Sequence, residues 1–145
     1  MTFQPYIDLQ SITEETQLQS LSQEILQDNI NRYAEASKDF NPIHIDESFA
    51  RSTALGGTIA HGMLILAYIT RMLTSNFGKS WLQTGKLNVR FKTPARPGDK
   101  VTISGAVKKV DRTEFGSQVR ADVVCRNQGG ETIISGESVL TFNNR

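Results

Sequence analysis

Cysteine is almost absent from this chain, since Cys125 is the single thiol among its 145 residues. One thiol cannot form an intramolecular disulfide, so the sequence excludes a disulfide-stapled secreted scaffold and suits a reducing compartment. Cys125 lies in an alternating, strand-like run, which favours an inert buried thiol over a reactive one. The length predicts one domain over residues 1–145 that can bury a core without disulfides or metals.

Long hydrophobic runs and an excess of one charge are also missing. The longest apolar stretch, Met63 to Met72, is interrupted by Thr70 and Arg71 and is far shorter than the roughly 20 residues of a membrane span. The N-terminus lacks a signal-peptide pattern, so we expect a cytoplasmic protein with no membrane partner. The 16 basic and 15 acidic residues form no basic stripe, which argues against nucleic acid as a partner.

The first part of the chain predicts helices and loops. Residues 1–15 show little periodicity and are expected to form an irregular lead-in, while Gln17–Ile25 alternates as a first strand. Apolar residues at i, i+3 and i+4 predict a helix over Gln27–Ser37. A short helix over Glu47–Arg51 is expected next, with Asp46 as its N-cap.

A much more apolar segment runs from Ala60 to Leu73, after the breaker Gly56-Gly57. Its apolar residues cover almost every face of a helix, and such a helix is typical of a protein core. The run Asn76-Phe77-Gly78 is expected to end it. We interpret this segment as a central buried helix and not as a cofactor site.

The second half of the chain alternates with period two, which predicts antiparallel strands with one buried face. The alternating segments are Leu87–Phe91, Val101–Val107, Val119–Cys125 and Ile134–Phe142, and the predicted turns are Pro97–Asp99, Asp111–Thr113 and Gln128–Gly130. Helices first and a strand meander afterwards predict an α+β domain, in which a curved antiparallel sheet wraps around the central helix.

The chemistry of the chain is concentrated between Asp39 and His44. A carboxylate and an imidazole within reach of one water can share its proton transfers. Pro42 stiffens the loop between them, and Asn41 can fix the turn through local backbone bonds. A helix that begins near Gly62 has N–H groups free to hold a carbonyl oxygen that gains negative charge. These parts predict the addition of water to an α,β-unsaturated thioester.

Two motifs, Ser37 to Asp46 and Ile59 to Leu64, resemble in order and spacing the MaoC-like, (R)-specific enoyl-CoA hydratases. Asn88–Phe91 and Pro97–Asp99 extend the resemblance, which covers roughly residues 25–142. It implies a hot-dog fold, a homodimer and no cofactor. It also implies reversible hydration of trans-2-enoyl thioesters of coenzyme A or acyl carrier protein to (R)-3-hydroxyacyl thioesters.

On this chain the resemblance implies Asp39 and His44 as the catalytic pair and Gly62 as the backbone donor, and it leaves open which of the pair is the base. A supporting hydroxyl maps to Thr70. We count Asn41 with Thr70 among the expected substrate-binding residues. Two positions depart from the family, which often has glycine where this chain has Lys38 and proline where it has Thr58.

A small cationic group stands near the predicted turn before the third strand, and it consists of Arg90, Lys92 and Arg96. These residues are either solvated strand ends or contacts to the phosphates of coenzyme A or of a phosphopantetheine arm. We include them among the expected substrate-binding residues.

Other interpretations compete with this one. His61 is interpreted as a structural histidine near a helix start, because Gly62 already supplies the donor. A metal site needs three or four suitably spaced ligands, so we expect none. A thioesterase that attacks the carbonyl carbon and a non-catalytic acyl-thioester-binding subunit both stay open, as do the acyl length and the direction of the reaction.

Overall fold

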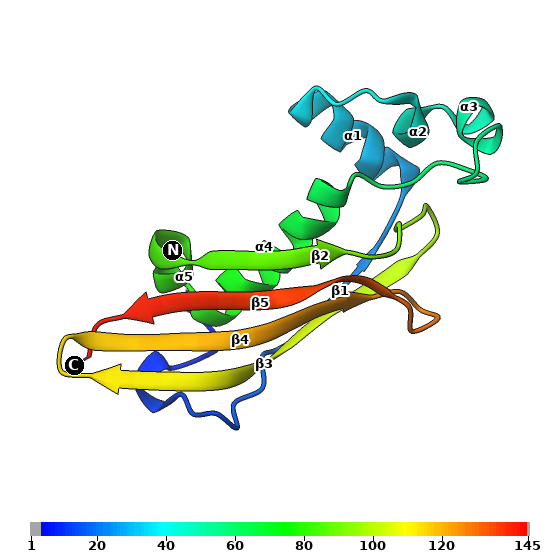
Figure 1. Ribbon diagram of the computed structural model, residues 1–145. Coiled ribbons are helices and arrows are strands. Elements are labelled where there is room, and N and C mark those ends of the chain that lie inside the picture. Colours follow the sequence, from blue (N-terminus) through cyan, green and yellow to red (C-terminus); the bar gives the residue numbers. More distant parts are fainter. Residues whose placement is uncertain (1–3, 145) are drawn as a thin grey trace.

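The computed structural model describes residues 4–144 of the chain. A curved antiparallel sheet holds helix α4 against its inner face, and three small helices lie together beyond one end of the sheet (Figure 1). The helices are η1 (Leu9–Ser11), α1 (Gln27–Ser37), α2 (Pro42–Ile45), α3 (Glu47–Arg51), α4 (Gly62–Phe77) and α5 (Lys79–Thr84). The strands are β1 (Leu21–Glu24), β2 (Lys86–Phe91), β3 (Lys100–Thr113), β4 (Gly116–Arg126) and β5 (Thr132–Phe142).

The five strands form one sheet in the order β1-β3-β4-β5-β2, and every neighbouring pair is antiparallel. The predicted period of two is clearest in β4, where Val119, Ala121, Val123 and Cys125 are all buried on one face. Val119 pairs with Leu140 on β5, so apolar side chains of adjacent strands stand together on the inner face. The α+β prediction is confirmed.

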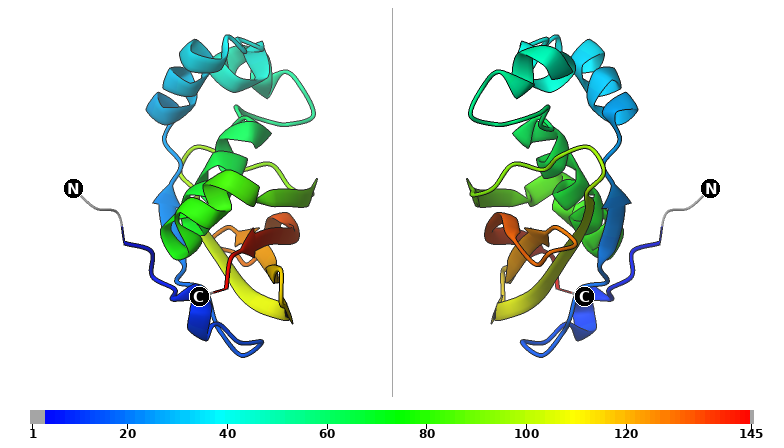
Figure 2. Two further views of the ribbon diagram at one scale, coloured as in Figure 1. Left: turned by 90° about the vertical axis from the view of Figure 1, so that its left-hand side faces the viewer. Right: turned by 90° about the vertical axis from the view of Figure 1, so that its right-hand side faces the viewer.

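Helix α4 ends at the predicted breaker but is less completely buried than predicted. It extends to Phe77 and ends at Gly78, which adopts a positive φ of 66° as the glycine signal suggested. Ile69 and Leu73 are fully buried against the sheet, but Met63 is 56% exposed and Arg71 is also exposed. The expectation of burial on every face is wrong for the described chain, because the sheet covers α4 from one side only (Figure 2).

The lead-in is more ordered than predicted over its described part, while residues 1–3 lie outside the described range. It contains the short helix η1, its Ile7 N–H donates to the Asn76 carbonyl at 3.0 Å, and Ile12 is buried. The first strand is shorter than the predicted Gln17–Ile25, and Gln17 itself forms only an isolated bridge to Ala106. No helix within residues 4–144 is long and apolar enough to cross a membrane.

Helices α1 and α3 have the predicted bounds, and the predicted turns at Pro97–Asp99 and Gln128–Gly130 are present. The turn predicted at Asp111–Thr113 is wrong, because those residues continue β3. The chain reverses at Glu114 and Phe115, since Gly116 adopts a φ of 142° that allows a tight hairpin there. Helices α1 to α3 lie at the N-terminal end of α4, so the Asp39–His44 segment faces the start of that helix (Figure 1).

Candidate active site

The segment around His44 is a one-turn helix and not the loop that the sequence predicted. Helix α1 ends at Lys38, which has a left-handed φ of 64°, and the chain then turns back. Asp39 Oδ1 accepts the Asn41 N–H at 3.2 Å, and Asn41 Oδ1 accepts the Ile43 N–H at 3.2 Å. Asn41 is thus the N-cap of α2, and Pro42 follows as its first residue, where a missing N–H costs nothing. Asn41 shapes the turn between the acid and the imidazole.

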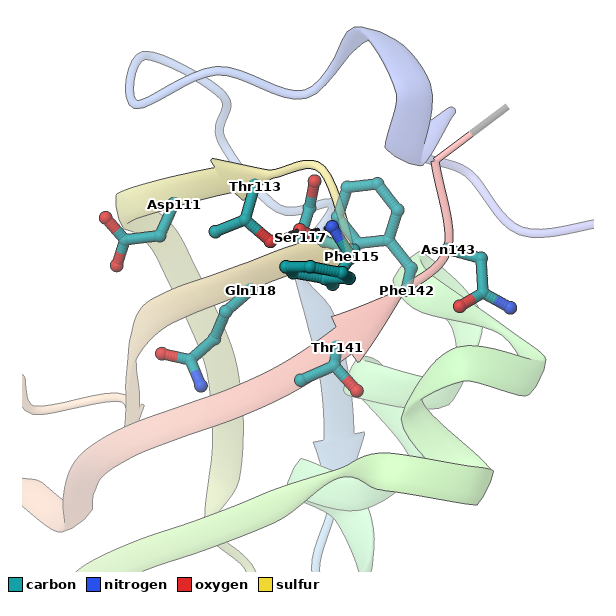
Figure 3. A pocket seen from close by; sticks show the side chains of 9 residues that line it. Asp111, Thr113, Phe115, Ser117, Gln118, Thr141, Phe142 and Asn143 are labelled. Atoms are coloured by element: carbon teal, nitrogen blue, oxygen red, sulfur yellow. Dashed lines mark hydrogen bonds between the residues drawn. The ribbon is translucent and has the colours of Figure 1, made fainter.

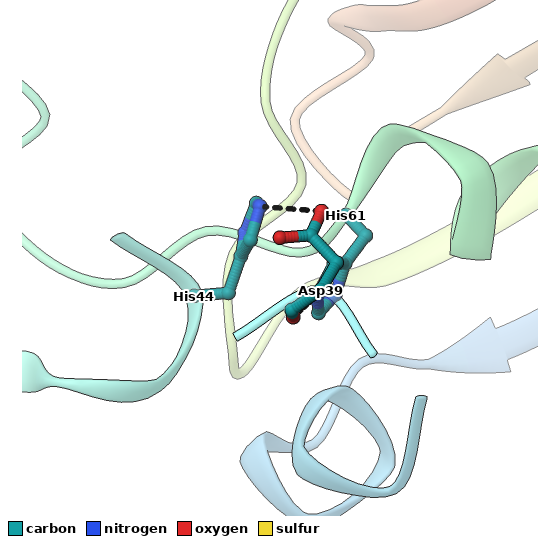
Figure 4. Close-up of side chains that lie close together, drawn as sticks. All are labelled: Asp39, His44 and His61. Atoms are coloured by element: carbon teal, nitrogen blue, oxygen red, sulfur yellow. Dashed lines mark hydrogen bonds and ion pairs between the residues drawn. The ribbon is translucent and has the colours of Figure 1, made fainter. Parts of the chain in front are cut away.

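The His44 imidazole is buried and held in one orientation. Its Nδ1 lies 2.8 Å from the Ile59 carbonyl oxygen, which can only accept, so Nδ1 carries the hydrogen and the neutral ring has a lone pair on Nε2. That Nε2 lies 4.0 Å from Oδ2 of Asp39 (Figure 4). The gap is too long for a direct hydrogen bond and suits one water bonded to both groups. The pair can therefore share the proton transfers of a bound water.

Gly62 begins α4 directly after its N-cap, His61. The Leu64 and Ile65 N–H groups donate to the His61 carbonyl, whereas the N–H groups of Gly62 and Met63 have no acceptor in residues 4–144. Free N–H groups at the start of a 16-residue helix can hold a developing oxyanion. The N–H that the sequence predicts as a backbone donor therefore lies at the first position of α4.

An apolar pocket of about 270 Å³ opens beside Gly62. The ring of Phe91, at the end of β2, lies over Gly62 so closely that an added Cβ would stand 2.9 Å from it. Ile65 and Ile134 contribute to the lining, and Lys92 borders the same pocket. Apolar walls next to free backbone donors suit a thioester whose carbonyl must be held while its carbon chain is desolvated.

His61 joins the two motifs. Its Nε2 lies 3.0 Å from the Asp39 carbonyl oxygen, and its ring stacks on that of His44 with centroids 3.8 Å apart. The ring of Tyr33, on α1, also packs against the His61 ring, with ring centroids 4.8 Å apart. The ring is buried, and its Nδ1 has no hydrogen-bond partner among the described residues. His61 thus bonds to the backbone of Asp39 and packs on the ring of His44, so it contacts both members of the predicted acid–imidazole pair.

Three possible metal ligands stand together here. One ligand atom each from Asp39, His44 and His61 lies within 4.8 Å of the others. A ring nitrogen binds a metal in the plane of its ring, and these two planes are stacked 3.8 Å apart and inclined by only 26°, so they do not converge near the rings. Ligands of one ion must converge on it. We therefore interpret the cluster as an acid–base site.

The predicted supporting residues are more scattered. The Thr70 hydroxyl donates to the Ala67 carbonyl at 2.9 Å within α4, and Thr70 is eight residues, roughly 12 Å along the helix, from Gly62. The chain does not bring Thr70 into contact with Asp39. Arg90 is exposed on β2, and Arg96 is half-buried in the loop after it. Of the cationic group, Lys92 lies nearest to the pocket beside Gly62.

A second hollow, of about 390 Å³, lies at the opposite end of the sheet near the β3–β4 hairpin (Figure 3). Asp111, Phe115 and Phe142 contribute to its walls, and Phe115 is 89% exposed. It holds no imidazole near its acid and no free helix N-terminus. The pocket beside Gly62 is therefore the candidate site.

The sequence analysis missed residues that complete this site. The Ile59 carbonyl orients the His44 ring, and the Phe91 ring covers Gly62. The Gln27 amide donates to the His44 carbonyl oxygen, and the Thr58 hydroxyl donates to the Gln27 amide oxygen. Thr58 stood out only as a departure from a family pattern, and no spacing signal pointed to the others.

Comparison with known proteins agrees with this geometry. The MaoC like domain matches residues 8–128 of the chain. The (R)-specific enoyl-CoA hydratase of Aeromonas caviae is 32% identical over 109 residues, which are 74% of this chain and 79% of that protein. The (R)-specific enoyl-CoA hydratase of Rhodospirillum rubrum is 31% identical over 128 residues, with 88% and 86% covered.

The solved structure of the (R)-hydratase from Aeromonas caviae involved in PHA biosynthesis matches with a TM-score of 0.80 at 27% identity, over 94% of this chain and 99% of that one. The curved sheet with its central helix is thus the hot-dog fold. The chain belongs to the MaoC-like domain family.

Proposed function

We propose that this protein is a hydro-lyase that hydrates trans-2-enoyl thioesters to (R)-3-hydroxyacyl thioesters and catalyses the reverse dehydration. One observation carries the proposal: His44 Nε2 and Asp39 Oδ2 face each other across 4.0 Å, and His61, which stacks on His44, directly precedes the free N–H of Gly62. His61 brings these parts together, since it precedes Gly62 and hydrogen bonds to the Asp39 carbonyl. The relatives named above support the class of reaction.

The reaction balances with these groups alone. A water held between Asp39 and His44 loses a proton to the pair as its oxygen bonds to the β-carbon of the enoyl group. The electron pair of the double bond moves toward the thioester oxygen, where the Gly62 N–H stabilises the enolate. The pair then returns a proton to the α-carbon, so hydrogen and hydroxyl are added and no cofactor is consumed.

The thioester carrier is either coenzyme A or acyl carrier protein, and both present the same phosphopantetheine arm. The proposal assigns Lys92 to phosphate contact, because it is exposed and borders the pocket beside Gly62. Arg90 and Arg96 are assigned the same role, although they do not line the pocket. None of the three forms an ion pair within residues 4–144, so each charge is available to a substrate anion.

We also propose that the protein forms a homodimer. Strand β2 is an edge strand that pairs only with β5 in the described chain, and Phe91 at its end is 54% exposed. Met63 at the start of α4 is 56% exposed, so apolar surface continues from the edge strand to the candidate site. Light scattering coupled to size exclusion should report twice the chain mass, and a monomer at assay concentrations would contradict this.

The deciding experiment follows crotonyl-coenzyme A with purified protein through the loss of enoyl absorbance. Free thiol and product chirality are measured in the same reaction, and Asp39→Asn serves as the inactive control. Rapid conversion to (R)-3-hydroxybutyryl-coenzyme A is expected. Thiol release would identify a thioesterase instead. Binding without turnover, on coenzyme A and on carrier-protein substrates of several chain lengths, would identify a non-catalytic subunit.

A further inference from the structure

Helix α2 is too short to hold His44 in place by itself. It has 4 residues, and one isolated turn costs more conformational entropy than its few hydrogen bonds return. The carbonyl groups at its end also lack partners within the helix. The His44 carbonyl oxygen accepts instead from Nε2 of Gln27 at 2.8 Å, across 17 positions of sequence. The position of this imidazole therefore depends on a side chain outside α2.

Gln27 is the first residue of α1, and both ends of its amide are engaged. Nε2 donates also to Oδ1 of Asn31 at 2.9 Å, and Oε1 accepts from the Thr58 hydroxyl at 2.8 Å. A rotated amide would place its oxygen against two other acceptor oxygens, those of His44 and Asn31. The partners thus allow only the orientation in which Gln27 donates to His44.

Thr58 is buried and holds the acceptor end of this amide. Its N–H donates to Oε2 of Glu47 at 3.0 Å, which leaves the single hydroxyl hydrogen for Gln27. The bond from the Thr58 N–H, followed by the bond from Arg51, keeps the pKa of Glu47 below its ordinary value of 4.5. The carboxylate is therefore charged at neutral pH. A continuous set of hydrogen bonds runs from Glu47 through Thr58 and Gln27 to the His44 backbone.

We propose that Gln27, oriented by Thr58, is a positioning residue that sets the distance of the His44 imidazole from Asp39. The inference rests on the proposed function, because it assigns Gln27 to the same acid–base site. Gln27 does not line the pocket beside Gly62 and acts through the His44 carbonyl. Three contacts thus locate the imidazole: the Gln27 amide at its backbone, the Ile59 carbonyl at its ring nitrogen and the stacked His61 ring on its face.

Two substitutions separate the hydrogen bond from the space that Gln27 fills. Gln27→Glu keeps the shape but cannot donate to the His44 carbonyl, and Gln27→Ala removes the group. Both should lower kcat by about 10- to 100-fold, the effect of displacing a catalytic group by about 1 Å. KM should stay within about twofold, because Gln27 does not contact the substrate. Gln23→Ala on β1 is the matched control, since the Gln23 side chain hydrogen bonds, among residues 4–144, only to the neighbouring Glu24 carbonyl.

A double-mutant cycle tests the part played by Thr58. Thr58→Val removes the hydroxyl and should lower kcat by less than Gln27→Ala does. Adding Thr58→Val to Gln27→Ala should cause no further loss, because Thr58 acts through the amide that is already gone. If the losses of kcat from the two single substitutions multiply in the double variant, Thr58 acts independently of Gln27. That result would overturn the proposal that Thr58 orients Gln27.

The tautomer of His44 gives a readout that needs no substrate. With ¹⁵N-labelled histidine, the native protein should show one His44 species that carries its hydrogen on Nδ1, as the bond to Ile59 requires. Gln27→Ala should convert this signal into a tautomer mixture while the protein stays folded by circular dichroism. A merely structural role would lower the thermal midpoint and leave the His44 signals of the folded protein unchanged.

The two proposals fail in different ways. A native protein that hydrates no enoyl thioester contradicts the proposed function, and the histidine signals still decide whether Gln27 positions His44. An active native protein whose Gln27→Ala and Gln27→Glu variants keep kcat within about twofold, with unchanged His44 signals, would overturn the positioning role alone.

Discussion

The rings of His44 and His61 lie face to face, with centroids 3.8 Å apart and planes inclined by 26°. Each ring also bonds to the backbone of another segment, His44 to the Ile59 carbonyl and His61 to the Asp39 carbonyl. The segment from Asp39 to His44 and the segment from Ile59 to Gly62 are therefore joined by two hydrogen bonds, one from a histidine of each segment. This reciprocal arrangement brings the acid, the imidazole and the Gly62 donor into one site.

The proposed catalytic pair should be essential for turnover, and the replacement of Asp39 should be nearly neutral for folding. Asp39→Asn and His44→Gln each remove one proton-transfer group, so kcat for enoyl thioester hydration should fall by about 10²- to 10⁴-fold. The side chain of Asp39 is 52% exposed, so its thermal midpoint should hardly change. Asp122→Asn, an exposed acid on the sheet, is the matched control. Near-normal turnover in both variants would remove Asp39 and His44 from the mechanism.

Gly62→Ala should reduce activity more than stability. The new methyl group would stand 2.9 Å from the Phe91 ring, which must move into the space beside the N–H donor. We expect kcat/KM to fall about 10²-fold, because the thioester carbonyl can no longer approach that N–H closely. Gly129→Ala, in an exposed turn, should leave the rate unchanged. If Phe91→Leu restores the activity of Gly62→Ala, the loss is caused by the displaced ring.

His61→Phe keeps a ring for stacking on His44 and removes the Nε2–H that holds the Asp39 carbonyl. The loss of one hydrogen bond should cost about 1 kcal/mol in the free energy of unfolding measured with denaturant. Turnover should fall about 10-fold or more, since Asp39 gains freedom. Tyr33→Phe preserves the aromatic contact with His61 and should behave as the native protein. A fully active His61→Phe variant would contradict this positioning effect.

Cys125 should be inert in the folded protein. Burial raises the pKa of its thiol to about 12 from an ordinary 9.0, so almost no thiolate exists at neutral pH. The folded state thus binds this proton more tightly than the unfolded chain. Its contribution to stability is complete below pH 9.0 and is lost as the pH rises toward 12. A thiol-reactive dye should label one site rapidly in denaturant and hardly at all without it; fast native labelling would refute the assignment.

Much of the fold follows from local patterns in the sequence. The bounds of α1 and α3 are as predicted, because apolar spacing and capping act within a few neighbouring residues. The strands of the second half follow from strict alternation for the same reason. The turn at Asp111–Thr113 was predicted wrongly, because a hairpin ends where the paired strand ends, and pairing with β4 carries β3 through Thr113.

For the candidate site, Asp39, His44 and Gly62 could be predicted from the chain alone, because their chemistry and their order are properties of the sequence. Their relative geometry could not. The 4.0 Å gap between the acid and the imidazole depends on the Ile59 carbonyl, on His61 and on Gln27, which meet only after packing. Periodicity reports which face of an element is buried. Contacts between distant segments arise only from the three-dimensional arrangement, and that arrangement brings the acid and the imidazole within reach of one another.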